Sequence, residues 1–265
     1  MLELIDIGIN LTHDSYDHDR AAVLSRAIDH GVRQFIITGA SAESSQAALD
    51  LVALSPRILR STAGCHPHHA VNYDATAHAT VAELLQHPWV VAVGETGLDY
   101  HRNFSSPSEQ RLAFERQLDL AVATRKPLFL HQRDAHADFI AMLTERAAVL
   151  PRAVLHCFTG NANELDESLE AGLWIGITGW ICDERRGHHL RDLVARVPAG
   201  RLMIETDGPY LLPRDLKPKP ESRRNEPMFL LHIAEVIAAA RGETLEELAA
   251  HTTHTARNFF EFPAE

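Results

Sequence analysis

A pattern that recurs eight times constrains the fold of this chain more than any other feature of its sequence. Each repeat holds a short apolar run, then polar residues, then a segment with helical periodicity. The apolar runs cover residues 4–9, 34–38, 58–63, 90–94, 128–130, 153–155, 173–177 and 202–204. Buried strands that alternate with helices are typical of parallel sheets, and eight such units can close into a (β/α)8 barrel. We therefore predict an α/β fold, a single TIM-type barrel that spans residues 1–265.

The segments between the apolar runs carry helix signals. Residues 16–31 place Ala21, Leu24 and Ile28 on one face, and Gly31 suits the position just past a helix end. Helices are also expected over residues 108–125, 163–171, 227–240 and 245–260, and Thr244 can cap the last of these. A doubly wound open sheet is the alternative architecture. It usually carries a GxGxxG loop after its first strand, and this sequence has no such motif there, so the barrel is favoured.

The composition narrows the class of protein. The 265 residues are 45% apolar and contain no linker-like stretch, which suits one globular domain. A net charge of -11 argues against a broad nucleic-acid-coating surface, but it permits an enzyme that binds a few nucleotides with clustered Arg and Lys. No apolar run reaches the roughly 20 residues that span a membrane, and the first residues do not resemble a secretory signal. Three cysteines without a CxxC pair are typical of reduced thiols, so we expect a cytoplasmic protein without membrane contact.

Residues with metal-binding side chains stand at or just past the ends of the apolar runs, positions that share one mouth in a barrel. In chain order they are Asp6, Asn10, His66, His68, Glu95, His131, His156 and Asp207. Each alone has a common structural role, and a glutamate such as Glu95 can form a salt bridge. A buried carboxylate is nevertheless costly without a partner or a cation. Two imidazoles with two carboxylates suit Zn2+, Mn2+ or Fe2+, and Mg2+ where water and phosphate oxygens complete the coordination.

The motifs that hold these residues resemble those of one protein family. They are residues 63–68 (AGCHPH), 94–99 (GETGLD), 131–135 (HQRDA), 155–160 (LHCFTG), 179–186 (GWICDERR), 205–210 (ETDGPY) and 224–227 (RNEP). In number and order they resemble the motifs of the TatD-type metal-dependent deoxyribonucleases, over essentially the whole chain. The resemblance implies a barrel of the metal-hydrolase kind that cleaves nucleic acid with Mg2+ or Mn2+.

The same resemblance implies roles for individual residues. The implied metal ligands are Glu95, His131, His156 and Asp207, and His66 is implied to line the phosphate site. We expect Asp207 to accept a proton from the attacking water, with His66 and Glu95 as further catalytic residues.

The first apolar run departs from the wider family. Most members carry Asp-x-His-x-His there, whereas this chain has Gly8 and Asn10 at the two histidine positions. We therefore expect one tightly held cation, with a second arriving only with substrate phosphate. We expect a structural hydrogen bond from Asn10 rather than a metal contact.

An acidic chain needs a local basic surface to hold DNA. Residues 213–224 carry five basic side chains against two acidic ones, in the loop after the last run, where barrels often bind phosphate. The candidate substrate-binding residues are His68, Arg133, Arg185, Arg186, Lys217, Lys219 and Arg224. A solvated charged loop without a ligand is the alternative.

Together these patterns and the family resemblance imply a metal-dependent 3′-to-5′ exonuclease that hydrolyses phosphodiester bonds of single-stranded DNA or RNA. The resemblance implies a role in DNA repair or degradation, with Mg2+ as the cofactor and Mn2+ or Zn2+ as alternatives; no obligate protein partner is evident. The competing function is a metal-dependent amidohydrolase or esterase, including hydrolysis of aminoacyl-tRNA esters. Such sites usually need a His-x-His pair and a bridging lysine, and the fourth run ends in Glu95 instead. A metal-binding scaffold without catalysis is a third reading, but the chain retains Asp207, which could activate water.

Overall fold

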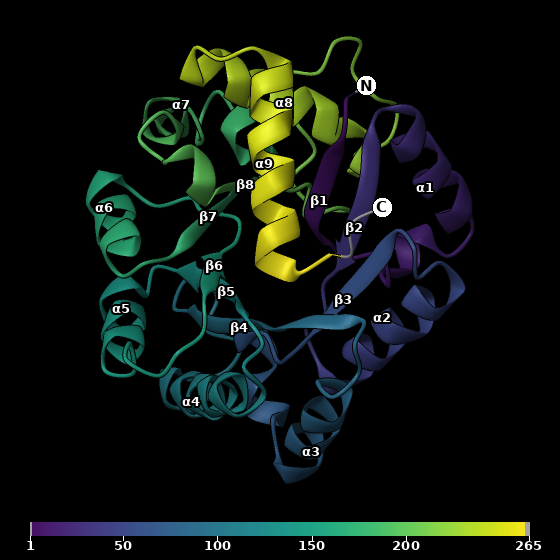
Figure 1. Cartoon of the computed structure of the whole chain (residues 1–265). Helices are drawn as coiled ribbons and strands as arrows, with labels where there is room; N and C mark the ends of the chain where they lie inside the picture. Colours follow the sequence, from purple (N-terminus) through teal and green to yellow (C-terminus); the bar gives the residue numbers. More distant parts are fainter. Residues whose placement is uncertain (1, 263–265) are drawn as a thin grey trace. The chain divides into compact units, whose positions relative to one another are not determined.

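The structure, a computed structural model, describes residues 2–262; residues 1 and 263–265, the ends of the predicted 1–265 domain, lie outside the described residues. Eight strands join in one sheet in chain order, from β1 to β8 (Figure 1). They are β1 (Leu4–Ile9), β2 (Val32–Ile37), β3 (Leu59–Ala63), β4 (Val90–Asp99), β5 (Leu128–Arg133), β6 (Ala153–Leu155), β7 (Trp174–Ile177) and β8 (Leu202–Ile204). The pairs β1–β2, β3–β4, β4–β5, β5–β6 and β7–β8 are parallel. Every predicted run forms a strand, and the predicted (β/α)8 class is confirmed.

Helices occupy the segments between the strands. The α-helices are α1 (Arg20–Asp29), α2 (Ala42–Leu54), α3 (Ala75–Leu84), α4 (Pro107–Thr124), α5 (His136–Thr144), α6 (Ala162–Glu170), α7 (His189–Val194), α8 (Leu230–Arg241) and α9 (Leu245–Phe260). Short 3-10 helices are η1 (Asp14–Tyr16), η2 (Pro67–Asn72), η3 (Gly179–Cys182), η4 (Ala199–Arg201) and η5 (Pro227–Phe229). Helix α9 begins as predicted, because the Thr244 side chain accepts a hydrogen bond from Glu247 N at 3.2 Å and the Glu247 carboxylate accepts one from Thr244 N at 2.9 Å.

Helix α1 and strand β4 differ most from their predicted bounds. Helix α1 begins at Arg20 rather than at residue 16, since residues 14–16 form η1. Strand β4 continues to Asp99 rather than ending at residue 94, because it stays paired with β5 through polar residues. Gly97 lies opposite His131, and Asp99 lies opposite Arg133. The longer β4 carries two acidic side chains where one was expected at the strand end.

The described chain forms two compact units that interleave in sequence. Unit 1 holds the described residues up to Ile37, Cys157–Ala162 and those from Ile175 onward, and unit 2 holds Thr38–His156 and Asn163–Trp174. The predicted polar residues fall into both units: Glu95, His131 and His156 belong to unit 2, and Asn10 and Asp207 belong to unit 1. The expectation of a single domain stays a prediction.

Helix α9 covers one end of unit 1. The Thr253 hydroxyl donates a hydrogen bond to Glu3 O, just before β1, at 2.7 Å. The Thr255 hydroxyl donates to Ala199 O, in η4 just before β8, at 3.3 Å. The N-terminal ends of β1 and β8 are therefore covered, and Asn10 and Asp207 follow the other ends of these two strands.

Two further expectations from the sequence concern the cysteines and membrane-spanning helices. Cys65, Cys157 and Cys182 form no disulfide bond within residues 2–262. No helix within residues 2–262 has the length and apolar character needed to cross a membrane.

Candidate active site

In unit 2, three imidazoles converge on one carboxylate oxygen. Glu95 Oε1 lies 2.7 Å from His156 Nε2, 3.2 Å from His131 Nδ1 and 3.3 Å from His66 Nε2. Glu95, His66 and His156 are each 8% exposed or less. We call these four residues the histidine–glutamate cluster. The structure thus brings together three of the four predicted metal ligands and adds His66 to them.

Two glycines allow β4 to present Glu95 in the cluster. Gly94 and Gly97 both have a φ of 142°, which other residues rarely adopt. A Cβ would lie 2.1 Å from Phe129 O at position 94 and 1.9 Å from His131 O at position 97. The register between β4 and β5 also shifts at this point, and such bulges re-aim side chains. The GETGLD motif therefore has glycine on both sides of Glu95 because β4 and β5 approach too closely for a side chain.

Each histidine of the cluster is oriented by its own strand or helix end. His131 lies within β5, and His156 directly follows β6, where its backbone N–H donates to Leu130 O at 2.9 Å. The ring of Phe129 stacks on the His156 ring at a centroid distance of 4.6 Å. His66 caps η2, and its Nδ1 accepts a hydrogen bond from the backbone N–H of the second residue after it at 3.0 Å. Because Nδ1 of His66 accepts, a neutral His66 ring carries its proton on Nε2, and that atom donates.

Asp99, two residues beyond Gly97 on β4, supports the cluster and was not assigned a role from the sequence. It is 1% exposed, and its Oδ2 accepts a hydrogen bond from His68 Nε2 at 2.8 Å. The same oxygen lies 3.5 Å from His131 Nε2, beyond good hydrogen-bond length. The alternation of a strand, which places residues 95, 97 and 99 on one face, was the signal that could have found it.

The charges of the cluster set its protonation states. Burial alone would raise the pKa of Glu95, but the neighbouring His66 and His156 and a hydrogen bond from His131 hold it well below its usual range. Burial lowers the pKa of His66 well below its ordinary value, against the opposing effect of Glu95, so this ring is neutral near pH 7. Burial also lowers the pKa of His131, but Asp99 and Glu95 together raise it more. The cluster therefore contains an ionised carboxylate and attracts positive charge.

The donor atoms of the cluster fit a divalent cation. Ligand atoms of His66, Glu95 and His131 lie within 4.8 Å of one another. Nε2 of His131 is buried and has no hydrogen-bond partner among residues 2–262, although Asp99 is close by. A histidine that binds a metal through one ring nitrogen usually directs the other toward a carboxylate, and His131 has this arrangement, with Nδ1 toward Glu95 and Nε2 toward Asp99.

In unit 1, Asp207 is held in a fixed turn after β8. Its φ is 54°, its backbone N–H donates to Gly8 O at 2.8 Å, and its Oδ1 accepts from Asn10 Nδ2 at 3.0 Å. The structural hydrogen bond expected of Asn10 is thus present. Asp6, fully buried, accepts from the backbone N–H of Thr206 at 2.9 Å and so fixes the residue before Asp207.

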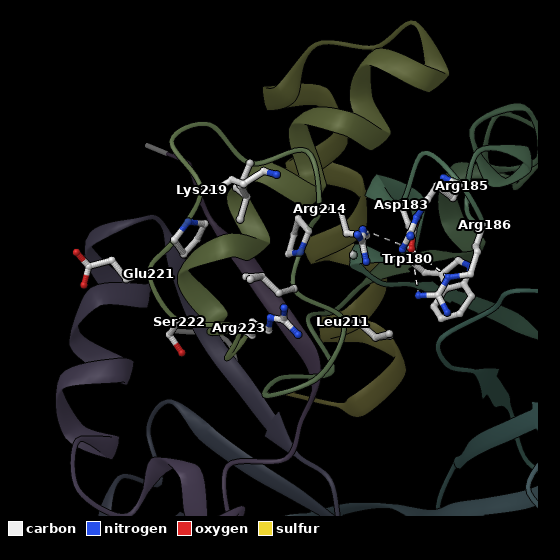
Figure 2. A pocket seen from close by; sticks show the side chains of 15 residues that line it. Trp180, Asp183, Arg185, Arg186, Leu211, Arg214, Lys219, Glu221, Ser222 and Arg223 are labelled. Carbon is white, nitrogen blue, oxygen red and sulfur yellow. Dashed lines mark hydrogen bonds and ion pairs between the residues drawn. The ribbon is translucent and has the colours of Figure 1, made fainter.

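Unit 1 also contains a cavity of about 730 Å³ with basic walls (Figure 2). Its charged lining residues are Asp183, Arg185, Arg186, Arg214, Lys219, Glu221 and Arg223. We call it the basic pocket. Asp183 is 3% exposed and pairs with Arg186 at 3.1 Å, Arg185 at 3.6 Å and Arg214 at 3.9 Å. The Arg186 guanidinium lies 4.4 Å above the centre of the Trp180 ring.

The predicted substrate-binding residues divide between this pocket and other places. Arg185, Arg186 and Lys219 line the basic pocket, and Lys217 is absent from its lining residues. His68 is bonded to Asp99 beside the cluster, and Arg133 ends β5. Arg224 binds Asp19 through two hydrogen bonds of 2.8 and 2.7 Å and Glu226 through one of 2.7 Å. Asp183 was given no role from the sequence, although it lies in the same GWICDERR motif as the two arginines.

The comparisons with known proteins agree with these motifs. Residues 5–261 match the family described as TatD related DNase. The chain is 51% identical over 261 residues to the 3′-5′ ssDNA/RNA exonuclease TatD of Erwinia billingiae, covering 98% of this chain and 100% of that protein. Its structure is similar to that of a TatD family hydrolase from Entamoeba histolytica (TM-score 0.90, 26% identity, 99% of each chain). It is also similar to YJJV, a TatD homologue from Escherichia coli K12 (TM-score 0.89, 27% identity, 98% of each chain). This chain therefore belongs to the family of TatD-related DNases.

Proposed function

We propose that this protein is a metal-dependent 3′-to-5′ exonuclease that hydrolyses single-stranded DNA and RNA. The relative from Erwinia billingiae, which is similar over its whole length, carries the name of this activity. The observation that carries the proposal is the histidine–glutamate cluster, whose buried carboxylate oxygen lies within 3.3 Å of three imidazole nitrogens. Nucleases of this kind need a cation next to the phosphate, and the cluster supplies suitable donors for one.

We further propose that the ion binds Glu95, His131 and His156. Asp207 stays the fourth ligand that the family resemblance implies. When bound, the ion would polarise a phosphoryl oxygen and lower the pKa of a water molecule. His66 is different from the other two histidines, because its Nδ1 already accepts a backbone hydrogen bond and its Nε2 keeps the proton. We therefore assign the Nε2–H of His66 to a phosphoryl oxygen of the substrate, where it would offset negative charge.

The identity of the ion follows from the donor atoms only in part. The family resemblance favours Mg2+ or Mn2+, and we propose Mg2+ as the physiological ion. Two imidazole ligands are unusual for Mg2+, which prefers oxygen, and they bind Mn2+ and Zn2+ more strongly. We therefore expect Mn2+ to bind the metal-free protein more tightly than Mg2+ does.

Asp207 is proposed to accept the proton of the attacking water. A general base must hold one orientation, and the Asp207 carboxylate is anchored through Oδ1 by Asn10. The turn that carries it is fixed in turn by Asp6 through the backbone of Thr206. These contacts give Asp207 a defined direction before any substrate binds.

The basic pocket is proposed to hold the phosphates of the nucleic-acid strand, with Arg185, Arg186 and Lys219 as contacts. Arg186 already covers one face of Trp180, so this grip depends on backbone charge more than on base stacking. Contacts to phosphate carry no sequence information, which suits an enzyme that shortens strands of any sequence. Lys217, His68 and Arg133 remain proposed contacts. Arg224, whose guanidinium is bound by two carboxylates, is proposed to anchor its loop instead.

The cellular setting is also a proposal. Cysteines that form no disulfide within the described residues suit a reducing compartment, and we propose that the protein is cytoplasmic. An exonuclease of single strands would serve DNA repair or DNA degradation, without an obligate protein partner.

The test uses metal-stripped protein with single-stranded DNA and RNA, each labelled at the 3′ or the 5′ end, and adds back Mg2+, Mn2+ or Zn2+. We expect a metal-dependent ladder that shortens from the 3′ end, abolished in the Glu95→Gln protein with its circular dichroism spectrum unchanged. Glu167→Gln is the matched control, because Glu167 also faces an imidazole, that of His136 at 3.0 Å, but lies outside the cluster. No cleavage with any metal, or cleavage by Glu95→Gln at the normal rate, would overturn the proposal.

A further inference from the structure

A second group of metal-ligating side chains lies in unit 1, outside the proposed active site. Ligand atoms of Cys182, Asp215 and His232 lie within 4.8 Å of one another. Cys182 ends η3 and is fully buried, His232 lies in α8, and Asp215 lies in the loop between β8 and η5. The His232 and Asp215 side chains are 26% and 18% exposed. Three separate segments of the chain thus contribute one donor each.

We propose that Cys182, Asp215 and His232 form a zinc-binding site. A thiolate, an imidazole and a carboxylate are the donors that Zn2+ takes in proteins, and three of them leave a fourth position for water. One thiolate and one carboxylate also balance the charge of a divalent ion. At ordinary zinc–ligand lengths of about 2.0–2.3 Å, tetrahedral donors lie roughly 3.3–3.7 Å apart. His232 Nε2 and Asp215 Oδ1, 2.7 Å apart, need only small side-chain rotations to admit the ion between them.

Two charged side chains, those of Arg191 and Glu235, lie next to the three donors. Arg191 Nη2 lies 3.4 Å from Asp215 Oδ2, which leaves Oδ1 on the side of His232. Glu235 Oε2 lies 3.8 Å from His232 Nδ1, the ring nitrogen that does not face Asp215. This distance is beyond hydrogen-bond length, but it places a carboxylate on the side where metal-bound histidines commonly have one.

The thiol distinguishes a metal site from a plain ion pair. Asp215 pairs with His232 at 2.7 Å and also accepts a hydrogen bond from the Cys182 thiol, so the other two donors already face this carboxylate. Burial and the charge of Asp215 raise the pKa of the Cys182 thiol, so the metal-free protein keeps the proton there. Zinc binding would release this proton and replace it with a bond to sulfur.

Zinc binding at this site would stabilise one wall of the basic pocket. Asp215 lies between Arg214 and Lys217 in the loop of residues 213–224. Cys182 directly precedes Asp183, which pairs with three arginines. An ion there would fix the loop and the arginine motif to helix α8. The inference does not depend on the nuclease function, because it rests on a different set of donors.

Cobalt substitution can test it directly. Metal-stripped protein is titrated with Co2+, and the near-ultraviolet absorption is followed, where a cobalt–thiolate bond gives a charge-transfer band. We expect this band in the wild type and in Glu95→Gln, which keeps the proposed zinc site. We expect its loss in Cys182→Ser, whereas Cys157→Ser, which changes a thiol outside the group, should retain it.

A measurement on the wild type avoids dependence on any variant. X-ray absorption at the zinc edge of protein loaded with two equivalents of Zn2+ should show a sulfur neighbour at about 2.3 Å. A spectrum with only nitrogen and oxygen neighbours, or a cobalt–thiolate band that survives in Cys182→Ser, would overturn the proposal. Loss of nuclease activity in Glu95→Gln with the band intact would confirm that the two sites are independent.

Discussion

Replacing Asp99 with Asn tests whether the histidine–glutamate cluster binds a metal ion and whether Asp99, next to His131, strengthens that binding. The substitution keeps the shape of the side chain, and Asp99 Oδ1 accepts backbone hydrogen bonds from His101 at 2.9 Å and Arg102 at 2.8 Å that an amide oxygen can keep. Only the atom at the Oδ2 position changes, and this oxygen lies 2.8 Å from His68 Nε2 and 3.5 Å from His131 Nε2. The change therefore removes a negative charge from behind one proposed ligand without touching any ligand.

The expected magnitude follows from these contacts. A hydrogen bond to a charged group contributes about 1.5–3 kcal/mol, and about 1.4 kcal/mol changes an affinity tenfold. Loss of a carboxylate behind a metal-bound histidine usually weakens metal binding about 10–100-fold. Because the contact between Asp99 and His131 is long, we expect Mn2+ affinity to fall toward the lower end, about tenfold.

Competition with a chelator measures this affinity for the wild type and Asp99→Asn. Asp134→Asn is the matched control, since Asp134 also faces a histidine, His101, at 2.8 Å, but is exposed and away from the cluster. An Asp99→Asn protein with the affinity of the wild type would refute the reasoning, as would an equal loss in Asp134→Asn.

Three other predictions follow from unit 1. Burial raises the pKa of Asp6 to about 7 against the weaker opposing effect of Thr206. The folded chain therefore holds a proton that the unfolded chain releases, and stability should fall as pH rises from about 4 to 7, by up to about 1.4 kcal/mol per pH unit. Urea unfolding across this range should show that Asp6→Asn loses this slope, and equal slopes would remove Asp6 as the cause. Asp207→Asn should lower kcat by about 10²–10⁴-fold at an unchanged Tm, and wild-type turnover would exclude it as the base. Changing Lys219 to Ala should reduce the slope of log affinity for single strands against log salt concentration by about 0.7. If the basic pocket holds the phosphates, Lys217→Ala should change this slope less. Equal effects of the two variants would assign phosphate binding to the loop as a whole.

The sequence predicted the strands best where the run is apolar on both faces. β1, β6 and β8 have the predicted bounds, because every residue in them is buried and no polar residue obscures their ends. β4 was cut short because glycine and acidic residues usually end a strand. Here the glycines continue it, since they allow the close approach to β5 that side chains would prevent. The missed role of Asp99 follows directly from this error.

The candidate site could be predicted in its residue types but not in its contacts. Glu95, His131 and His156 follow or end strands, and parallel strands bring such positions together. The Asp19 carboxylate that binds Arg224 and the Asn10 amide that binds Asp207 come from segments far away in the sequence. No local periodicity encodes these contacts, because they depend on how loops return to the strands.

The central claim is that the histidine–glutamate cluster holds the catalytic ion, and anomalous scattering from Mn2+-soaked crystals tests it most directly. We expect an anomalous peak bonded to Glu95 Oε1, His131 Nδ1 and His156 Nε2, in protein that cleaves DNA with Mn2+. The same active protein with no peak among these atoms would contradict it.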